Sequence, residues 1–281
     1  MSDAVTASAH NAWRDATPAR VGLGRVGDGM PTDEVLRFGW AHARARDAVH
    51  RALDTAALQA DLTAQGWQTE RARSRAPDRA TYLRRPDLGR QLDPEDATRL
   101  RAVSAARGQG QRADVCIVAA DGLSSLAVQR HCPPLLGALQ PLLPAVLRCS
   151  PIVVATQARV ALGDDIGEAF AAALVVVLIG ERPGLSSPDS LGIYLTYAPQ
   201  RGRHDAQRNC ISNVRPEGLS YPRAAHQLAW LIRESTRRAF SGVALKDESH
   251  LETIDGPGTG DLGQGSATGA VDAPTSGPPD G

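Results

Sequence analysis

The arrangement of hydrophobic and polar residues divides the chain into three parts. The part up to residue 112 is expected to be mainly helical, and from residue 31 to about Leu53 its apolar residues recur at the three- and four-residue spacing of an amphipathic helix. From Asp114 to Phe240, short apolar runs alternate with further helical stretches. After about Thr253 the pattern stops, and Gly, Pro, Asp, Ser and Thr dominate. This last part buries too little apolar surface to offset the entropy of ordering, so we expect it to be disordered.

Four short runs rich in β-branched residues predict buried strands. They are Val115–Ala119, Ile152–Thr156, Leu174–Ile179 and Leu191–Tyr197. Helices are expected at residues 124–147 with a break at Pro133 and Pro134, at residues 163–172 and at residues 224–240. This alternation indicates an α/β fold with a mostly parallel, Rossmann-like sheet that helices cover on both faces.

The N-terminal part of the chain is expected to be mainly helical. Helices are predicted at residues 31–53, 55–65 and 93–106, and Thr32 is the expected N-cap of the first. Residues 69–75 are arginine-rich and weakly patterned, while Thr81–Arg90 is expected to be a strand or extended piece that leads into a turn. A Gly-rich linker follows at residues 108–112. We therefore expect a flexible arm (1–18), a mainly helical region (19–112), an α/β domain (113–246) and a disordered tail (247–281).

Composition and charge narrow the class of protein. The 281 residues include 31 basic and 31 acidic side chains, so there is no basic surplus to favour binding of nucleic acid or an anionic membrane. The longest apolar run, residues 169–179, is too short to span a bilayer. The first twenty residues lack the apolar core of a secretory signal. We therefore expect a cytoplasmic protein.

The sequence lacks the common motifs for metals and nucleophiles. Its cysteines are Cys116, Cys132, Cys149 and Cys210, of which Cys210 is expected in a polar loop. They form no CxxC pair and have no His at metal-ligand spacing, so we expect neither a metal site nor a disulfide framework. Ser124 does not lie in a G-x-S-x-G context, and no Walker A loop occurs. We therefore assign no catalytic residue.

Polar residues follow three of the predicted strands. Asp121-Gly122 comes after the first strand, Arg159-Val160 after the second and Glu181-Arg182 after the third. Because the carboxyl ends of parallel strands share one edge of a sheet, these groups are expected to line a common crevice. Glu181 is either a general base or a carboxylate held by Arg182 or by loop amides, and the residues alone do not decide between these roles. A crevice without nucleophile or metal ligands favours a binding module or an accessory subunit.

Several longer segments carry a resemblance to a known family. In their order and combination, they resemble the small (light) subunit of ethanolamine ammonia-lyase over about residues 18 to 246. The segments are Ala19–Gly27, Leu36–Phe38, His42–Asp47, Tyr82–Arg90, Asp121–Ser124, Gly180–Leu185 and Asn209–Asn213. Each piece is weakly specific by itself, whereas the whole set in this order is highly specific.

The resemblance implies a function, a cofactor and a partner. The family forms part of an adenosylcobalamin-dependent enzyme that converts ethanolamine to acetaldehyde and ammonia. The large subunit, a TIM barrel, holds the substrate, and the small subunit helps to clamp the cobalamin against the mouth of the barrel. Many relatives carry a longer N-terminal arm that targets a bacterial microcompartment, so this compartment is the alternative location. The arm before Ala19 is short here.

Three positions are implied as cobalamin contacts. The Val of a G-R-V segment corresponds to Val160, the Glu of G-E-R-P-G to Glu181 and the Cys of C-I-S-N to Cys210. The first segment departs from the family pattern, since Ala158 stands where the family usually has Gly. Val160 is expected to pack on an apolar part of the corrin, and Glu181 to accept hydrogen bonds from amide or hydroxyl groups. Cys210 is expected to contribute through packing or its backbone.

The sequence also bears on the mode of cofactor binding and on alternative functions. No D-x-H-x-x-G string occurs, so we expect base-on binding, with the cofactor's own benzimidazole as the lower ligand. The main alternative function is a stand-alone cobalamin- or nucleotide-binding module with a regulatory or carrier role. An independent dinucleotide oxidoreductase rests only on the G-x-G-x-x-G of Gly22–Gly27. No strand precedes these glycines, which favours a simple connector.

Overall fold

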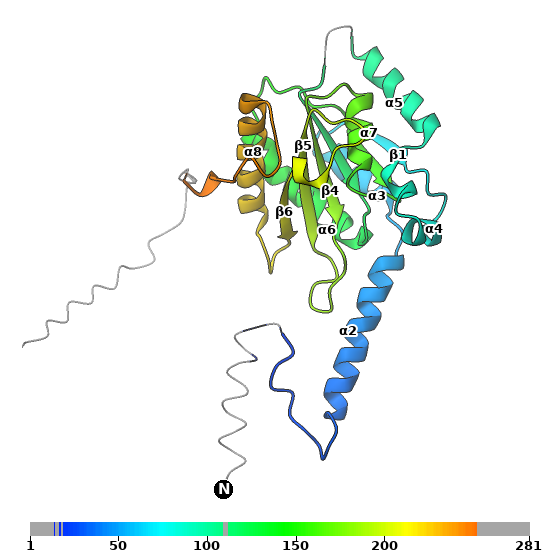
Figure 1. The fold of residues 1–281 in the computed structure, drawn as a ribbon, viewed down its shortest axis with the longest axis vertical. Helices are drawn as coiled ribbons and strands as arrows, with labels where there is room; N and C mark the ends of the chain where they lie inside the picture. The colour runs from blue at the N-terminus through cyan, green and yellow to red at the C-terminus, as the bar shows by residue number, and fades with distance from the viewer. Residues whose placement is uncertain (1–13, 15–16, 18, 109–111, 252–281) are drawn as a thin grey trace, which may run out of the picture.

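The computed structural model describes residues 14, 17, 19–108 and 112–251, which include a six-stranded sheet flanked by helices (Figure 1). The strands are β1 (Thr69–Arg73), β2 (Val115–Ala120), β3 (Ile152–Thr156), β4 (Leu174–Gly180), β5 (Leu191–Tyr197) and β6 (Arg208–Val214). Their order across the sheet is β1-β3-β2-β4-β5-β6. The first four in this order are parallel, and β5 and β6 extend the sheet through antiparallel pairs. The α/β class is thus confirmed with a mixed sheet, and the finer Rossmann-like assignment stays a prediction.

Helices cover both faces of the sheet, as predicted. One face packs against α3 (Thr55–Ala64), α6 (Ser125–Leu139) and α8 (Tyr221–Arg238), while α5 (Pro94–Ala106) and α7 (Leu162–Ala169) cover the other, called here the α5/α7 face. Alternate residues of β2 enter the two cores, Val115, Ile117 and Ala119 in the first and Cys116, Val118 and Ala120 in the second. A strand that is buried on both faces needs a continuous apolar run, which explains why the central strands are visible in the sequence.

Two expectations about α6 and the segment after it are wrong. Pro133 and Pro134 lie inside α6, and the helix continues through them. A proline inside a helix costs about 3 kcal/mol or more, but α6 buries much of its surface in the core, which offsets that cost. The second helix expected up to Leu147 is only the 3-10 turn η2 (Gln140–Leu142). Leu143 is already extended, as the residue before a proline prefers.

The segment Thr81–Arg90 is helical, so the prediction of an extended piece is wrong. α4 (Arg79–Arg84) begins after Asp78, whose carboxylate accepts a hydrogen bond from the Thr81 amide at 2.7 Å. The 3-10 turn η1 (Leu88–Arg90) follows it. The cap on a free backbone donor stabilises the first turn of a helix that is too short to show a clear apolar period.

The strands β1 and β6 are not visible in the sequence pattern. Cys210, expected in a polar loop, lies in β6, and β1 is formed by the weakly patterned arginine-rich segment. Both strands lie at an edge of the sheet and expose several side chains, so neither contains a buried apolar run. Since β1 pairs with β3, the sheet draws on chain before residue 113. The division into domains at residue 112 stays a prediction.

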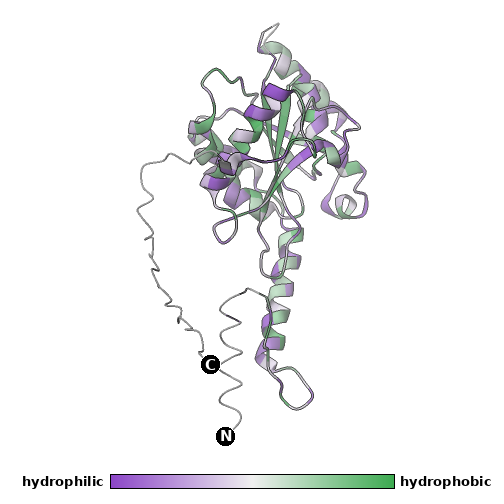
Figure 2. Ribbon diagram, turned by 60° about the vertical axis from the view of Figure 1, so that its left-hand side comes forward, coloured by the Kyte–Doolittle hydropathy of each residue, from purple (hydrophilic) through white to green (hydrophobic). Residues whose placement is uncertain are grey.

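The helix α2 (Thr32–His50) projects from the body of the molecule (Figure 1). It lies where the sequence predicts a helix, although Thr32 is its first helical residue and not its N-cap. Only three of its residues are buried. Its apolar side chains are largely in solvent, and Leu36 and Trp40 are each 68% exposed. Figure 2 shows hydrophobic residues along this helix away from the sheet.

Segments before α2 and after α8 flank the folded body. Val26 and Gly29 pair across a tight turn in the glycine-rich segment, and no strand precedes that turn in the described residues. The connector interpretation stays a prediction. The expected arm (1–18) and tail (247–281) lie mainly outside the described residues. None of the described helices is both long and apolar enough to cross a bilayer.

Candidate functional site

The carboxyl ends of three parallel strands form one edge of the sheet. β3, β2 and β4 are neighbours and run in the same direction. Asp121, Val160 and Glu181 follow these strands, so the prediction that the three strand ends share an edge is confirmed. Ligands of α/β proteins commonly bind at such an edge.

A close approach between two turns fixes the start of the loop after β4. Gly122 has φ +56°, and a Cβ there would lie 2.2 Å from the carbonyl oxygen of Gly180, so this turn admits no side chain. The Leu123 amide donates a hydrogen bond to the same oxygen at 2.9 Å. Further along, Ser124 Oγ donates to the Pro188 carbonyl oxygen at 2.8 Å. The turn before α6 therefore holds the loop after β4 at both of its ends.

Glu181 is a hydrogen-bond acceptor in the structure. Glu181 is half-buried, and its carboxylate accepts a hydrogen bond from the backbone N–H of Asn213 in β6. The distances from this nitrogen to the two carboxylate oxygens are 3.3 and 3.4 Å. Gly192 of β5 lies beside it, and a Cβ there would be 3.1 Å from Glu181 Oε1. Among the described residues Glu181 forms no ion pair with Arg182, which is exposed. Of the roles left open by the sequence, a carboxylate held by a backbone amide matches these contacts.

Cys210 and Tyr194 form a pair beside Glu181. They lie opposite each other on β6 and β5, so their side chains are neighbours on one face of the sheet. Partial desolvation raises the pKa of the Cys210 thiol, and Glu181 adds to this shift. Desolvation also raises the pKa of Tyr194, with further contributions from Cys210 and Glu181. Both groups are therefore protonated at neutral pH, and the surface offers a thiol and a phenol rather than a nucleophilic anion.

Val160 lies on the same face of the sheet as this pair. It precedes α7, and its half-buried side chain packs against the core cluster of the α5/α7 face, as does Tyr194. Alternation along β4 places Glu181 on this face as well, because Val177 and Ile179 belong to the same cluster. The three residues implied by the resemblance thus face the same side of the sheet.

Two ion pairs fasten α7 to the antiparallel end of the sheet. Asp164 and Arg208 are each 2% exposed and form a two-pronged pair, with N–O distances of 2.7 and 2.8 Å. Burial raises the pKa of Asp164, and the Arg208 guanidinium opposes that shift. Asp165 accepts two hydrogen bonds from Arg201 of the loop between β5 and β6. Since Arg208 and Cys210 share β6, the Asp164–Arg208 pair ties α7, which begins just after Val160, to the strand that carries Cys210.

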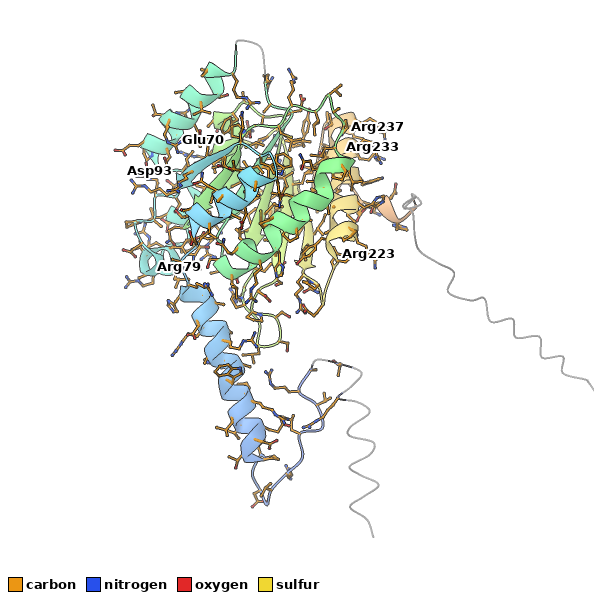
Figure 3. All side chains as sticks on the ribbon, turned by 180° about the vertical axis from the view of Figure 1, so that it is seen from behind. Glu70, Arg79, Asp93, Arg223, Arg233 and Arg237 are labelled. Atoms are coloured by element: carbon orange, nitrogen blue, oxygen red, sulfur yellow. The ribbon has the colours of Figure 1, made fainter. Side chains whose placement is uncertain are left out.

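A second polar cluster lies at the same edge of the sheet. Asp121 accepts the amides of Gln157 at 2.8 Å and Ala158 at 2.9 Å, and Arg79 Nη1 lies 3.4 Å from its carboxylate. Arg79 also donates to the Val49 carbonyl near the end of α2, and Figure 3 shows it at the point where α2 leaves the body. Three polar atoms of this cluster are buried and have no partner among the described residues. They are Arg79 Nη2, Gln157 Oε1 and Arg159 Nε.

Sequence reasoning missed several residues that shape the site. Gly192 and Tyr194 stand two positions apart in a predicted strand, and this period of two is a signal that both face one side. Asn213, Asp164 and Arg208 gave no such signal, because their contacts depend on β6, which the pattern did not reveal.

The arrangement is suited to binding rather than to bond-breaking by the protein itself. It combines the apolar surface of Val160, a carboxylate acceptor on Glu181 and two protonated groups on Tyr194 and Cys210. In the part of the chain that the structure describes, no group of three His, Cys, Asp or Glu side chains is placed to hold a metal ion.

Comparison of the sequence with known proteins identifies the family of this chain. The family model described as "Ethanolamine ammonia-lyase light chain (EutC)" matches residues 7–246. The chain is 56% identical over 264 residues to the ethanolamine ammonia-lyase small subunit of Azotobacter vinelandii, which covers 92% of this chain and 97% of that protein. It is 54% identical over 249 residues to the same subunit of Pseudomonas syringae pv. tomato, covering 87% and 86% of the two chains. The chain belongs to the ethanolamine ammonia-lyase light chain family.

Proposed function

We propose that this chain acts as the small subunit of an ethanolamine ammonia-lyase, an enzyme that converts ethanolamine to acetaldehyde and ammonia. The observation that carries the proposal is the family match over residues 7–246, with 56% identity to a relative that is covered over 97% of its length. The site supports an accessory role, because its groups are those of a binding surface.

The α5/α7 face is suited to adenosylcobalamin, the cofactor implied by the family. A corrin is broad and largely apolar, with a fringe of amide side chains. Val160 and Tyr194 offer apolar surface to such a ligand, and Glu181 offers an acceptor for its amide N–H groups. The orphaned Arg159 Nε and its buried neighbours fit an edge that a polar ligand completes.

We assign Val160, Glu181 and Cys210 as the residues of this subunit that would hold the cofactor. When bound, adenosylcobalamin supplies radical chemistry through homolysis of its Co–C bond. The residues of this chain bind and orient the corrin and exclude water, and none is assigned a catalytic role. We further propose base-on binding. An electron-resonance spectrum of the cob(II)alamin state tests it, because splitting by a protein histidine nitrogen would contradict it.

The proposed partner is a larger, TIM-barrel subunit that holds most of the substrate site. The names "light chain" and "small subunit" of the matching proteins imply a larger companion chain. The projecting helix α2 supports such a partner, because exposure of the large apolar side chains of Leu36 and Trp40 does not stabilise an isolated chain. The proposed location is the cytoplasm, with a bacterial microcompartment as the alternative. We propose no contact with nucleic acid or membrane.

The decisive experiment is an assay of this chain purified together with the large subunit of an ethanolamine ammonia-lyase. With adenosylcobalamin and ethanolamine, the pair should release acetaldehyde and ammonia, whereas neither subunit alone should do so. The rival function is a stand-alone cobalamin- or nucleotide-binding module. Tight binding of adenosylcobalamin by the isolated chain, with no activity from any pairing, would favour the rival and exclude the subunit proposal.

A further inference from the structure

Arg159 occupies a distinctive place at the edge of the sheet. It lies in the segment after β3, immediately before Val160, and its side chain is only half-buried. Its backbone amide donates a hydrogen bond to the Gly89 carbonyl at 2.8 Å. A Cβ on Gly89 would lie 3.0 Å from Arg159 Cγ, so the absence of a side chain at Gly89 provides the space that the Arg159 side chain occupies. The local sequence therefore fixes both the backbone and the stem of Arg159.

The Arg159 guanidinium is held by stacking on an aromatic ring. Its central carbon lies 4.5 Å from the ring centroid of Tyr82, and the Arg79 guanidinium lies 4.7 Å from the same centroid. Tyr82 is fully buried, and its hydroxyl donates to the Ala158 carbonyl at 3.0 Å. Burial raises the pKa of Tyr82 to about 12, so the hydroxyl keeps its proton. A cation on a fixed ring loses little conformational freedom when it binds a ligand.

The two arginines of this stack differ in their partners. Arg79 faces the Asp121 carboxylate and donates to the Gly122 and Val49 carbonyls. Asp121 is in turn occupied by backbone amides at the end of β3. Among the described residues, no acidic side chain forms an ion pair with Arg159, and its buried Nε has no partner. The structure thus holds a fixed positive charge, without a counter-charge, next to a residue that we assign to the cofactor cleft.

We propose that Arg159 binds a phosphate group, namely the phosphodiester in the nucleotide loop of the cobalamin. The inference rests on the proposed function and adds a fourth cofactor-binding residue, the one that recognises an anion. The rest of the corrin fringe is made of neutral amides, which leaves the phosphodiester as its charged group. A guanidinium matches a phosphate in both charge and geometry, because its planar N–H groups donate to two oxygens at once.

A matched pair of probes isolates the phosphate in the assembled complex of both subunits. Adenosylcobinamide phosphate carries the phosphate but not the base, and adenosylcobinamide lacks both. We expect the wild-type complex to bind the phosphate-bearing probe roughly ten- to hundredfold more tightly in a spectroscopic titration. Arg159→Gln should abolish this preference while leaving the affinity for adenosylcobinamide unchanged, and Arg159→Lys should retain part of it.

Controls separate the inference from its rivals. Arg223 is exposed on α8, far from Arg79 in Figure 3, so Arg223→Gln makes the same charge change and should keep the full preference. An undiminished preference in Arg159→Gln would overturn the inference. Equal weakening of both probes, or loss of subunit association on size-exclusion chromatography, would also overturn it, because Arg159 would then serve the fold or the partner. Failure of the wild-type complex to bind either probe would instead reject the proposed function itself.

Discussion

Glu181 shows how the surroundings of a side chain decide its role. A carboxylate at the end of a buried strand is a candidate base when only the sequence is known. In the structure it accepts a backbone amide from β6 and contributes to the raised pKa values of Tyr194 and Cys210. No proton donor or acceptor with a pKa near neutrality is among these contacts. The carboxylate is therefore placed to receive hydrogen bonds, and the amide fringe of the proposed corrin ligand would supply donors for it.

Replacement of Glu181 tests this role at the level of one residue. Glu181→Ala should weaken adenosylcobalamin binding in the assembled enzyme by roughly ten- to hundredfold, since losing a charged acceptor costs about 1.5–3 kcal/mol. Turnover at saturating cofactor should fall less than the affinity. Glu181→Gln keeps an oxygen for the Asn213 amide and should give an intermediate affinity. An unchanged apparent affinity in a cofactor titration would contradict the assignment.

His131 gives the stability of the folded protein a dependence on pH. It is buried in α6, where Nδ1 lies 2.8 Å from the Tyr221 hydroxyl and Nε2 lies 3.6 Å from the carboxylate of Asp189, in the loop after β4. Burial lowers the pKa of His131 below 6.5, although Asp189 opposes the shift and Arg130 assists it. The unfolded chain therefore binds the proton at a higher pH than the folded protein does.

The free energy of unfolding should consequently fall as the pH drops through 6.5 toward the lower pKa of folded His131. His131→Gln should lack this part of the pH dependence. Urea unfolding of both proteins at about pH 7.5 and about pH 5.5 provides the comparison, with stability read from the transition midpoint and slope. If the difference between the two proteins is the same at both pH values, His131 does not titrate as its burial implies.

At the scale of elements, burial on both faces separates what is predictable from what is not. β4 is a run of apolar residues because both of its faces are covered, and the sequence shows it directly. β6 is an edge strand that contains Arg208 and Cys210, and its many polar residues resemble the sequence of a loop. α6 contains two prolines that a local rule treats as a break, whereas tertiary packing maintains the helix.

Burial of the strands also decides which parts of the site were predictable. Val160 and Glu181 follow buried parallel strands, so their common edge follows from the sequence pattern alone. The place of Cys210 beside Tyr194 depends on the pairing of β5 with β6, which contains an irregularity between Leu191 and Ile193. Such a register depends on contacts between distant segments, and no local period encodes it.

The buried Asp164–Arg208 pair allows a test of the link between α7 and β6. Arg208→Met should lower the free energy of unfolding by about 3–5 kcal/mol, because it leaves the Asp164 carboxylate buried without its cation. Asp164→Leu combined with Arg208→Met should recover much of that loss, since apolar groups need no counter-charge. Urea unfolding of the wild type, both single variants and the double variant forms the required cycle. A double variant no more stable than Arg208→Met would show that the ion pair is not the main contribution.

At the scale of the whole molecule, α2 is the feature that a single chain does not explain. A helix of 19 residues extends about 28 Å, and it leaves the body with most of its surface in solvent (Figure 1). Leu36 and Trp40 are one helical turn apart and therefore lie on the same side of the helix. The exposed segment also follows a connector whose Val26 is 69% exposed. An apolar surface of this kind marks a site of protein association.

The proposed large subunit is the partner that this surface should contact. Leu36→Ser together with Trp40→Ser should leave the fold of the isolated chain intact, because both side chains are mainly in solvent, and should weaken association with the large subunit at least tenfold. Burying each of these side chains contributes roughly 1.5–3 kcal/mol, and about 1.4 kcal/mol is a factor of ten. His42→Ser, an exposed change on the opposite side of α2, is the matched control and should associate as the wild type does. Titration of one labelled subunit with the other measures the effect, and circular dichroism checks the fold. If association is unchanged while the wild-type chain alone forms a dimer that the double variant loses, α2 contacts a second copy of this chain and not the large subunit.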